Sequence, residues 1–135
     1  MLEVYIDGAS KGGAGPSGAG IYIKGADFQE KHSIFLGNMD NHEAEFAALV
    51  EGLKICINKN YKSASFRTDS QAVDHAVQKR FVKHNRYKPH LQQALALMEQ
   101  MDLFFLKWIP EKQNKIADEL AKKAIWNHEK REKKT

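Results

Sequence analysis

Cysteine is nearly missing from this sequence, and so is any long apolar segment. The single cysteine, Cys56, lies in the apolar run LKICI, so a disulfide framework is excluded and Cys56 is expected in the core. No apolar run approaches the ~20 residues that a membrane-spanning helix needs. The N-terminus, MLEVYIDG, lacks the basic-then-apolar order of a secretory signal. These absences predict a cytoplasmic protein with no membrane partner.

The motifs of several enzyme classes are also missing. The six histidines show no zinc-ligand spacing, and no serine lies in a G-x-S-x-G elbow. Residues 13–18 match G-x-G-x-x-G, but a dinucleotide-binding loop requires a helix to open directly after it. Here a strand-like segment, IYIK, follows, and Pro16 interrupts the loop. The match is therefore accidental, and no organic cofactor is expected.

Length and composition describe an ordinary globular domain. The 135 residues are 42% apolar and 28% charged, which suits one domain over residues 1–135. Residues 129–135 read as a frayed, basic C-terminal tail. The net charge of +4 favours polyanionic partners only weakly. No repeat or linker interrupts the chain, and we expect a monomer.

Hydrophobic periodicity predicts five strands and four helices in the order β-β-β-α-β-α-α-β-α. The strands are expected at residues 2–7, 21–24, about 28–36, 63–69 and 103–109, with a glycine-rich loop before the second. The helices are expected at about 40–58, 70–78, from 89 onward, and 114–128. The buried side of the last helix should carry Ile116, Leu120, Ala121, Ala124 and Ile125. This order predicts an α/β fold whose five-stranded mixed sheet has strands 1–3 antiparallel and strands 1, 4 and 5 parallel, flanked by helices.

Four acidic residues stand where this fold can bring them together. Asp7 ends the first strand and Asp69 ends the fourth, at the edge where functional groups of parallel strands gather. Glu45 and Asp118 lie in the first turns of two helices, beside small or apolar neighbours. Either acid alone suits the helix dipole. Together, however, four carboxylates repel one another, and burial of an unpaired charge is costly, so a cation partner is indicated. Ligation by carboxylates alone selects Mg²⁺ or Mn²⁺.

A basic segment precedes the third helix. It contains five cations and no acid, interleaved with aromatic residues: Lys79, Arg80, Lys83, Arg86 and Lys88. Such a mixture suits contact with phosphates and stacking on bases. A solvated loop between helices explains the same stretch equally well.

Four motifs together resemble ribonuclease H of type 1. They are D-G-A-S-K-G-x-x-G-x-x-G-A-G, N-x-x-A-E-F-x-A-L-x-x-G-L, T-D-S-Q and A-D-E-L-A-x-x-A, and they span nearly the whole chain. The resemblance implies a nuclease that cuts the RNA strand of RNA–DNA hybrids with two Mg²⁺ (or Mn²⁺) ions, leaving 5′-phosphate and 3′-hydroxyl ends. It makes Asp7, Glu45, Asp69 and Asp118 the catalytic, metal-binding carboxylates, with Asp7 bridging. It also assigns contacts with the hybrid to Gly12, Gly13, Asn41, His42, Gln71 and the basic segment.

The sequence departs from the family pattern at three places. A histidine-bearing loop before the last helix is missing, and the candidates to replace it are Glu111, Lys112 and Asn114. Asp40 stands where the family commonly has threonine, and His42 where it has a second asparagine. An aspartate near a phosphate pocket predicts weaker binding or a lower rate. Two alternatives follow: a non-catalytic hybrid- or RNA-binding module, or another nuclease of the same fold.

Overall fold

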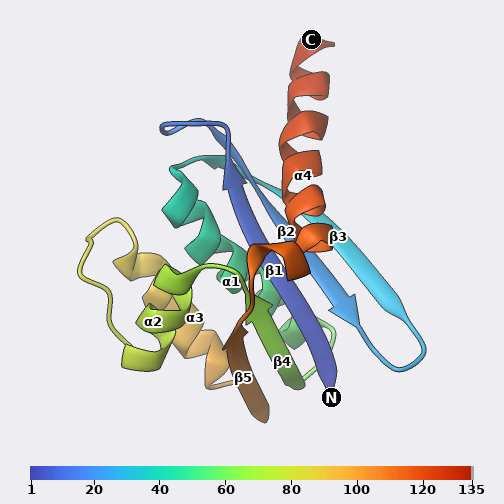
Figure 1. The fold of residues 1–135 in the computed structure, drawn as a ribbon, viewed down its shortest axis with the longest axis vertical. Helices are drawn as coiled ribbons and strands as arrows, with labels where there is room; N and C mark the ends of the chain where they lie inside the picture. Colours follow the sequence, from blue (N-terminus) through green and yellow to red (C-terminus); the bar gives the residue numbers. More distant parts are fainter. Residues whose placement is uncertain (135) are drawn as a thin grey trace.

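The computed structural model describes residues 1–134, which form five strands, four α-helices and one short 3-10 helix (Figure 1). The strands are β1 (Leu2–Ser10), β2 (Pro16–Lys24), β3 (Gln29–Asn38), β4 (Ser63–Thr68) and β5 (Leu103–Trp108). The helices are α1 (Asn41–Asn58), α2 (Gln71–Lys79), α3 (Lys88–Met98), η1 (Glu111–Gln113) and α4 (Lys115–Lys133).

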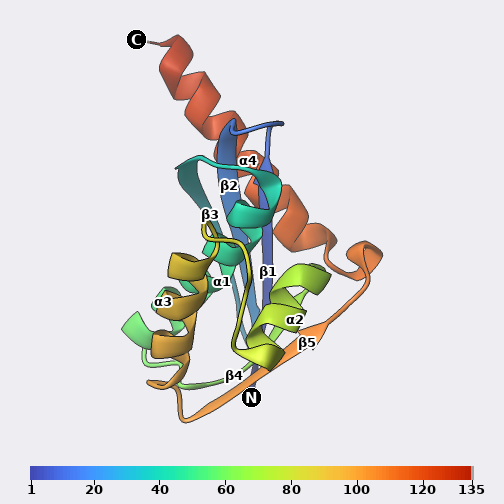
Figure 2. The ribbon, with the colours of Figure 1, turned by 90° about the vertical axis from the view of Figure 1, so that its left-hand side faces the viewer.

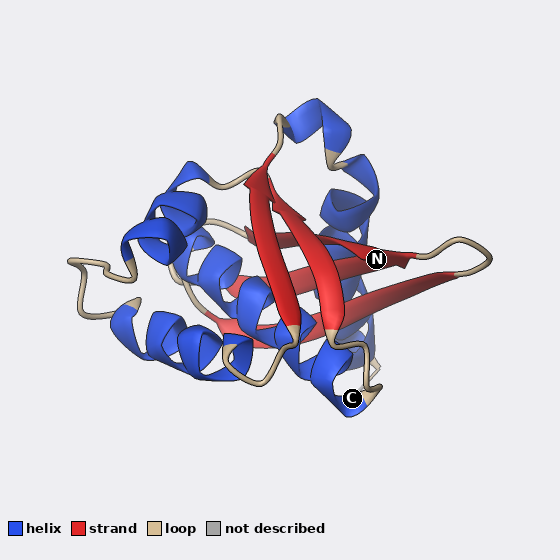
Figure 3. Cartoon of the chain, turned by 90° about the horizontal axis from the view of Figure 1, so that it is seen from below, coloured by secondary structure: helices blue, strands red, loops and turns tan. Residues whose placement is uncertain are grey.

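All five strands belong to one sheet in the order β3-β2-β1-β4-β5. Neighbours β1, β2 and β3 are antiparallel, whereas β1, β4 and β5 are parallel. This arrangement confirms the predicted mixed sheet. The sheet twists strongly between its antiparallel and parallel parts, as right-handed strands require (Figure 3).

Helices cover the two faces of the sheet unequally. On one face α1 packs against β1 and β2, α3 packs against α1, and α2 lies near β4 and β5. The main core lies here: Phe46, Leu49 and Leu53 of α1 are buried with Ile6 and Phe66 of the sheet. On the other face α4 packs against β1, β2 and β3. The C-terminal part of α4 projects beyond the sheet (Figures 1 and 2).

The first hairpin is longer than the sequence predicts. β1 continues past Asp7 to Ser10, and β2 begins at Pro16 rather than at residue 21. The ladder pairs Ser10 with Ser17 and Asp7 with Gly20, so the glycine-rich loop is confined to residues 11–15. Glycine usually weakens a strand. Here the pairing and the helix packed on it hold these glycines extended.

The last helix also differs from its prediction. α4 continues to Lys133, so residues 129–133 are helical and not a frayed tail; Thr135 lies outside the described residues. An ion pair between Lys11 and Glu129 ties this part of α4 to the glycine-rich loop. Ile116, expected to be buried, is 39% exposed, because it lines an open pocket at the start of α4. No helix within residues 1–134 is long and apolar enough to span a membrane.

Candidate active site

The parallel ladder between β1 and β4 brings two of the four carboxylates together. Its last pair joins Ile6 to Thr68, and the next residues along the two strands are Asp7 and Asp69. Asp7 therefore lies at the end of the parallel pairing, although β1 itself continues alongside β2. The indole Nε1 of Trp108 donates a hydrogen bond of 3.1 Å to the backbone oxygen of Asp69 and holds the turn after β4.

Two glycines bring the remaining carboxylates to the same point. A Cβ on Gly8 would lie 2.2 Å from the backbone oxygen of Ala44, so only glycine lets the first turn of α1 approach β1 this closely. A Cβ on Gly20 would lie 1.9 Å from the backbone oxygen of Ala117, at the start of α4. Gly8 follows Asp7 in sequence, and Gly20 is its partner on β2. Consequently Glu45 and Asp118, which follow the two alanines, are placed beside Asp7.

The electrostatics of Asp7 confirm that the carboxylates are neighbours. Its pKa is raised from the ordinary 3.8 to about 9, first by burial and next by the charge of Asp69. A hydrogen bond with Asp118 and the charge of Glu45 act in the same direction. The pKa values of Glu45 and Asp69 are also raised, chiefly by burial. Ionising all four carboxylates at once is therefore energetically unfavourable in the metal-free protein.

Three of the carboxylates have other partners in the protein. Glu45 lies 3.3 Å from His42, and Asp118 lies 2.9 Å from Lys122. Asp69 accepts a hydrogen bond of 3.2 Å from Asn114. In this arrangement no group of three or more acidic, histidine or cysteine side chains among residues 1–134 forms a ready coordination shell. The donor set nevertheless fits a hard cation, since it consists of neighbouring carboxylates whose repulsion a cation would relieve.

Asn114 connects the cluster to the backbone. It is 1% exposed, and its Nδ2 donates both to Asp69 and, at 2.9 Å, to the backbone oxygen of Ile6. It is also the residue that precedes α4, and its backbone oxygen accepts a hydrogen bond of 3.1 Å from the backbone nitrogen of Asp118. Of the three residues predicted as replacements for the histidine loop, Asn114 is thus in direct contact with a carboxylate. Glu111 is near enough for its charge to raise the pKa of Asp69, after the larger effect of burial. Lys112 lines an open hollow that Asp118 also lines.

Comparison with known proteins agrees with this geometry. Residues 6–124 match the sequence model of the family described as reverse transcriptase-like. The solved N-terminal ribonuclease H domain of Rv2228c from Mycobacterium tuberculosis is 30% identical, with a TM-score of 0.81, over 92% of this chain and 98% of that one. The chain belongs to the ribonuclease H family.

Other relatives support the same family. EbsB of Enterococcus faecalis, named only provisionally as a hydrolase, is 39% identical over 93% of this chain and 94% of its own length. The crystal structure of ribonuclease H1 from Halobacterium salinarum has a TM-score of 0.87 at 25% identity, covering 93% of this chain and 98% of that one. The chain spans only 35% of full-length Rv2228c, which is named a bifunctional protein.

The family resemblance predicts five contacts with the hybrid outside the basic segment. Gly12 and Gly13 form the tip of the first hairpin, both with positive φ. Asn41 accepts a hydrogen bond of 3.0 Å from the backbone nitrogen of Ser10, so it joins this hairpin to the start of α1. His42 pairs with Glu45, as described above. Gln71, at the start of α2, is exposed. These contacts remain predictions for this ribonuclease H; Gly12, Gly13 and Asn41 belong to or contact the first hairpin, and His42 contacts a carboxylate.

The basic segment is only partly free to meet a nucleic acid. Arg86 forms an ion pair of 2.7 Å with Asp40, and Arg80 lies 3.8 Å from Glu99. Lys79, Lys83 and Lys88 form no ion pair with any residue of 1–134; Lys79 and Lys83 are exposed and Lys88 is half-buried. Phe81 is 59% exposed. The part of the segment that is free of ion pairs and exposed is therefore Lys79, Lys83 and Phe81, with the half-buried Lys88 at the start of α3.

Asp40 has two structural roles, of which the sequence predicts one. As predicted, it caps α1 by accepting a hydrogen bond of 2.7 Å from the backbone nitrogen of Glu43. It is also ion-paired with Arg86. Although burial opposes the shift, these two interactions lower the pKa of Asp40. Its charge is thus compensated within the protein, which weakens the expected repulsion of a phosphate.

Sequence reasoning missed three contacts of the cluster. Lys122 pairs with Asp118 at i,i+4, a spacing that was visible in the sequence. Ser70 hydrogen-bonds Glu45, and Trp108 bonds the Asp69 backbone; both depend on pairing between distant segments.

Proposed function

We propose that this protein is a metal-dependent endoribonuclease that hydrolyses the RNA strand of RNA–DNA hybrids, leaving 5′-phosphate and 3′-hydroxyl ends. The convergence of Asp7 with Glu45, Asp69 and Asp118 carries the proposal. Repulsion among these carboxylates destabilises the metal-free protein, whereas bound divalent cations would relieve the repulsion and be held by the same charges.

The chain's own residues prepare this chemistry. Asp7, Glu45, Asp69 and Asp118 would hold two Mg²⁺ or Mn²⁺ ions, which supply an activated water and charge stabilisation at the phosphate. Asn114 keeps Asp69 oriented through its bond to the Ile6 backbone. In the metal-free protein Lys122 is ion-paired with Asp118, and His42 lies beside Glu45. Both carboxylates would leave these partners when cations bind.

Family relatives indicate the substrate. Several are named ribonuclease H or ribonuclease HI, including that of Halobacterium salinarum, which is 26% identical over 92% of this chain. A structure of LC11-RNase H1 in complex with an RNA/DNA hybrid shares this fold, with a TM-score of 0.85 at 24% identity. The free cations Lys79 and Lys83 suit contact with the phosphates of one strand, and the 2′-hydroxyl distinguishes RNA from DNA.

A cleavage assay on three labelled substrates tests the proposal. Hybrid, duplex RNA and duplex DNA are incubated with the protein in Mg²⁺ and in Mn²⁺, and the product ends are analysed. Cleavage of the RNA strand of the hybrid alone is expected. Asp69→Asn should abolish it, while Asp27→Asn, an exposed aspartate in the β2–β3 turn, should leave it unchanged.

Two results would contradict the proposal in different ways. Asp69→Asn cutting at the parent rate would refute the assigned site. Hybrid binding without scission in either metal would establish a binding module instead, which the partnered state of the carboxylates and the missing histidine loop would then explain.

A further inference from the structure

Half of the sheet face that carries Asp7 is left open by α4. Strand register places two rows of side chains on this face, running across β2, β1, β4 and β5. One row is Lys24, Glu3, Ser65 and Phe105; the other is Tyr22, Tyr5, Arg67 and Lys107. We call these two rows the open sheet face. α4 packs over β1, β2 and β3 above them, so the β4–β5 end has no helix in front of it (Figure 1).

The open sheet face combines aromatic rings with positive charge. Phe105 is 52% exposed on the edge strand, although a strand residue facing water is usually polar. The Arg67 guanidinium lies 5.5 Å from the centre of the Tyr5 ring, and the Tyr5 and Tyr22 rings are 5.6 Å apart. Glu3, the acid of the two rows, is paired with Arg67 at 3.0 Å. Phe105 is thus the exposed ring of the two rows, whereas Tyr5 is half-buried and Tyr22 is buried. After internal pairing, the two rows carry no uncompensated acid.

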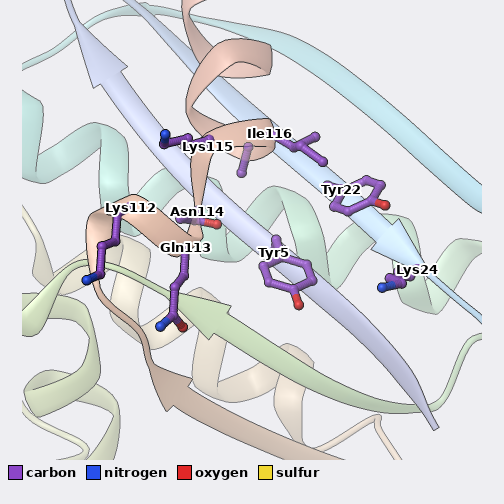
Figure 4. Close-up of a pocket in the computed structure, with 9 residues that line it drawn as sticks. Tyr5, Tyr22, Lys24, Lys112, Gln113, Asn114, Lys115 and Ile116 are labelled. Atoms are coloured by element: carbon purple, nitrogen blue, oxygen red, sulfur yellow. The ribbon is translucent and has the colours of Figure 1, made fainter.

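A pocket of about 300 Å³ lies where this face meets the start of α4 (Figure 4). Its walls include Tyr5, Tyr22, Lys24, Lys112, Asn114 and Lys115. Together with Lys107, the three lysines form no ion pair with any residue of 1–134. The volume is at the lower end of the range for small-ligand sites. Three unpaired lysines around aromatic walls, with Lys107 on the neighbouring part of the open sheet face, select an anion that also carries a flat ring.

Asn114 supplies an independent sign that this site is incomplete. Its Nδ2 is satisfied by Ile6 and Asp69, which fixes the side-chain orientation. Its Oδ1 is buried and accepts no hydrogen bond from the described residues. A buried acceptor without a donor is unfavourable, because it has lost water and gained no partner. A donor group entering the pocket would satisfy it, and the exocyclic amine of a nucleobase is such a group.

We propose that the open sheet face binds single-stranded nucleic acid, with one nucleotide seated in the pocket between Tyr5, Tyr22 and the lysines. Stacking on aromatic side chains beside dispersed cations is how single strands are held without sequence preference. The location of the face supports this partner. Tyr5 is two residues before Asp7 on the same face of β1, so a single-stranded nucleic acid bound there would extend toward the carboxylates. The inference goes beyond hybrid cleavage and does not depend on it.

Fluorescence anisotropy in EDTA tests the proposal, because without metal no strand is cut. The probe is a fluorescein-labelled single-stranded RNA of about 12 nucleotides, a common site size for such surfaces. Lys24→Glu/Lys107→Glu should weaken binding at least ~10-fold, and Phe105→Ala should weaken it ~5-fold or more. The matched controls Lys54→Glu/Lys123→Glu and Trp126→Ala, with the same charge change and a comparably exposed aromatic residue elsewhere, should stay within ~2-fold.

Three outcomes would overturn the proposal. They are no binding by the parent protein, equal losses in the two double variants, and equal affinity for an acidic peptide of the same charge. The last would show that charge alone is recognised. Circular dichroism of each variant establishes that it is folded. Since the assay needs no turnover, a failure here leaves hybrid cleavage standing, and a failure to cleave hybrids leaves this test intact.

Discussion

Asp7→Asn should make the metal-free protein more stable. Asn keeps the shape of Asp7 but removes the charge whose pKa is raised to about 9 by burial and by the neighbouring carboxylates. Between the unfolded pKa near 3.8 and the folded value, the folded state holds a proton that the unfolded chain has released. Stability of the parent therefore falls as pH rises through this window, and the loss is complete only above about pH 9.

The size of the effect is bounded by two considerations. A single proton changes the free energy of unfolding by at most about 1.4 kcal/mol per pH unit. Asp7 is only partly buried, and it shares its proton with its neighbours, so the full slope is not reached. We expect a gain on the order of 2 kcal/mol at pH 8, the usual cost of a poorly compensated buried polar group.

Urea unfolding followed by circular dichroism measures this directly. The parent, Asp7→Asn and the exposed control Asp102→Asn are compared in EDTA at pH 5.5, 7 and 8. The gain should grow with pH for Asp7→Asn and be absent for Asp102→Asn. Excess Mg²⁺ should stabilise the parent and leave Asp7→Asn unaffected. An Asp7→Asn protein that is less stable than the parent at pH 8 would refute the reasoning.

Three further predictions concern the parts around the cluster. Gly20→Ala places a methyl group against the backbone of Ala117 and should destabilise the protein by roughly 3 kcal/mol or more, seen as a lower urea midpoint; an unchanged midpoint would mean that α4 does not pack as described. Asn114→Ala leaves the Ile6 oxygen unbonded and should cost about 1–3 kcal/mol in stability and lower kcat with little change in KM; a change confined to KM would contradict its positioning role. Lys83→Ala should weaken hybrid binding and reduce the dependence of log K on log salt by about 1, whereas Arg86→Ala should change it less; titrations at several salt concentrations decide between equal and unequal slopes.

The fold could be predicted from the sequence because its signals are local. Alternation in Leu2, Val4 and Ile6, the cap at Asp40 and the helical stripe through Phe46 and Leu49 all indicate elements that the structure contains. The extent of β2 could not be predicted in this way. Its glycines resemble a loop, and they are extended only because β1 pairs with them and α4 packs on them.

In the candidate site, too, the residues marked by local sequence signals could be predicted, and the contacts between distant segments could not. The four carboxylates could be selected because two stand where the parallel pairing of strands ends and two stand near the start of a helix, and the structure brings them together. Their present partners could not be selected, with the exception of Lys122 and His42, which stand at i,i+4 and i,i+3 from the acids that they contact. Whether Arg86 faces a nucleic acid or Asp40, and whether Asn114 faces solvent or Asp69, depends on how distant segments pack. Periodicity carries no information on that.

The central claim, that these four carboxylates bind divalent cations, is tested most directly by crystals of the protein soaked in Mn²⁺. An anomalous difference map should show density within coordination distance of Asp7, shared with at least two of Glu45, Asp69 and Asp118. Side chains of Glu45 and Asp118 should have left His42 and Lys122. A map with no peak at Asp7 at saturating Mn²⁺, and with those two ion pairs intact, would contradict the account.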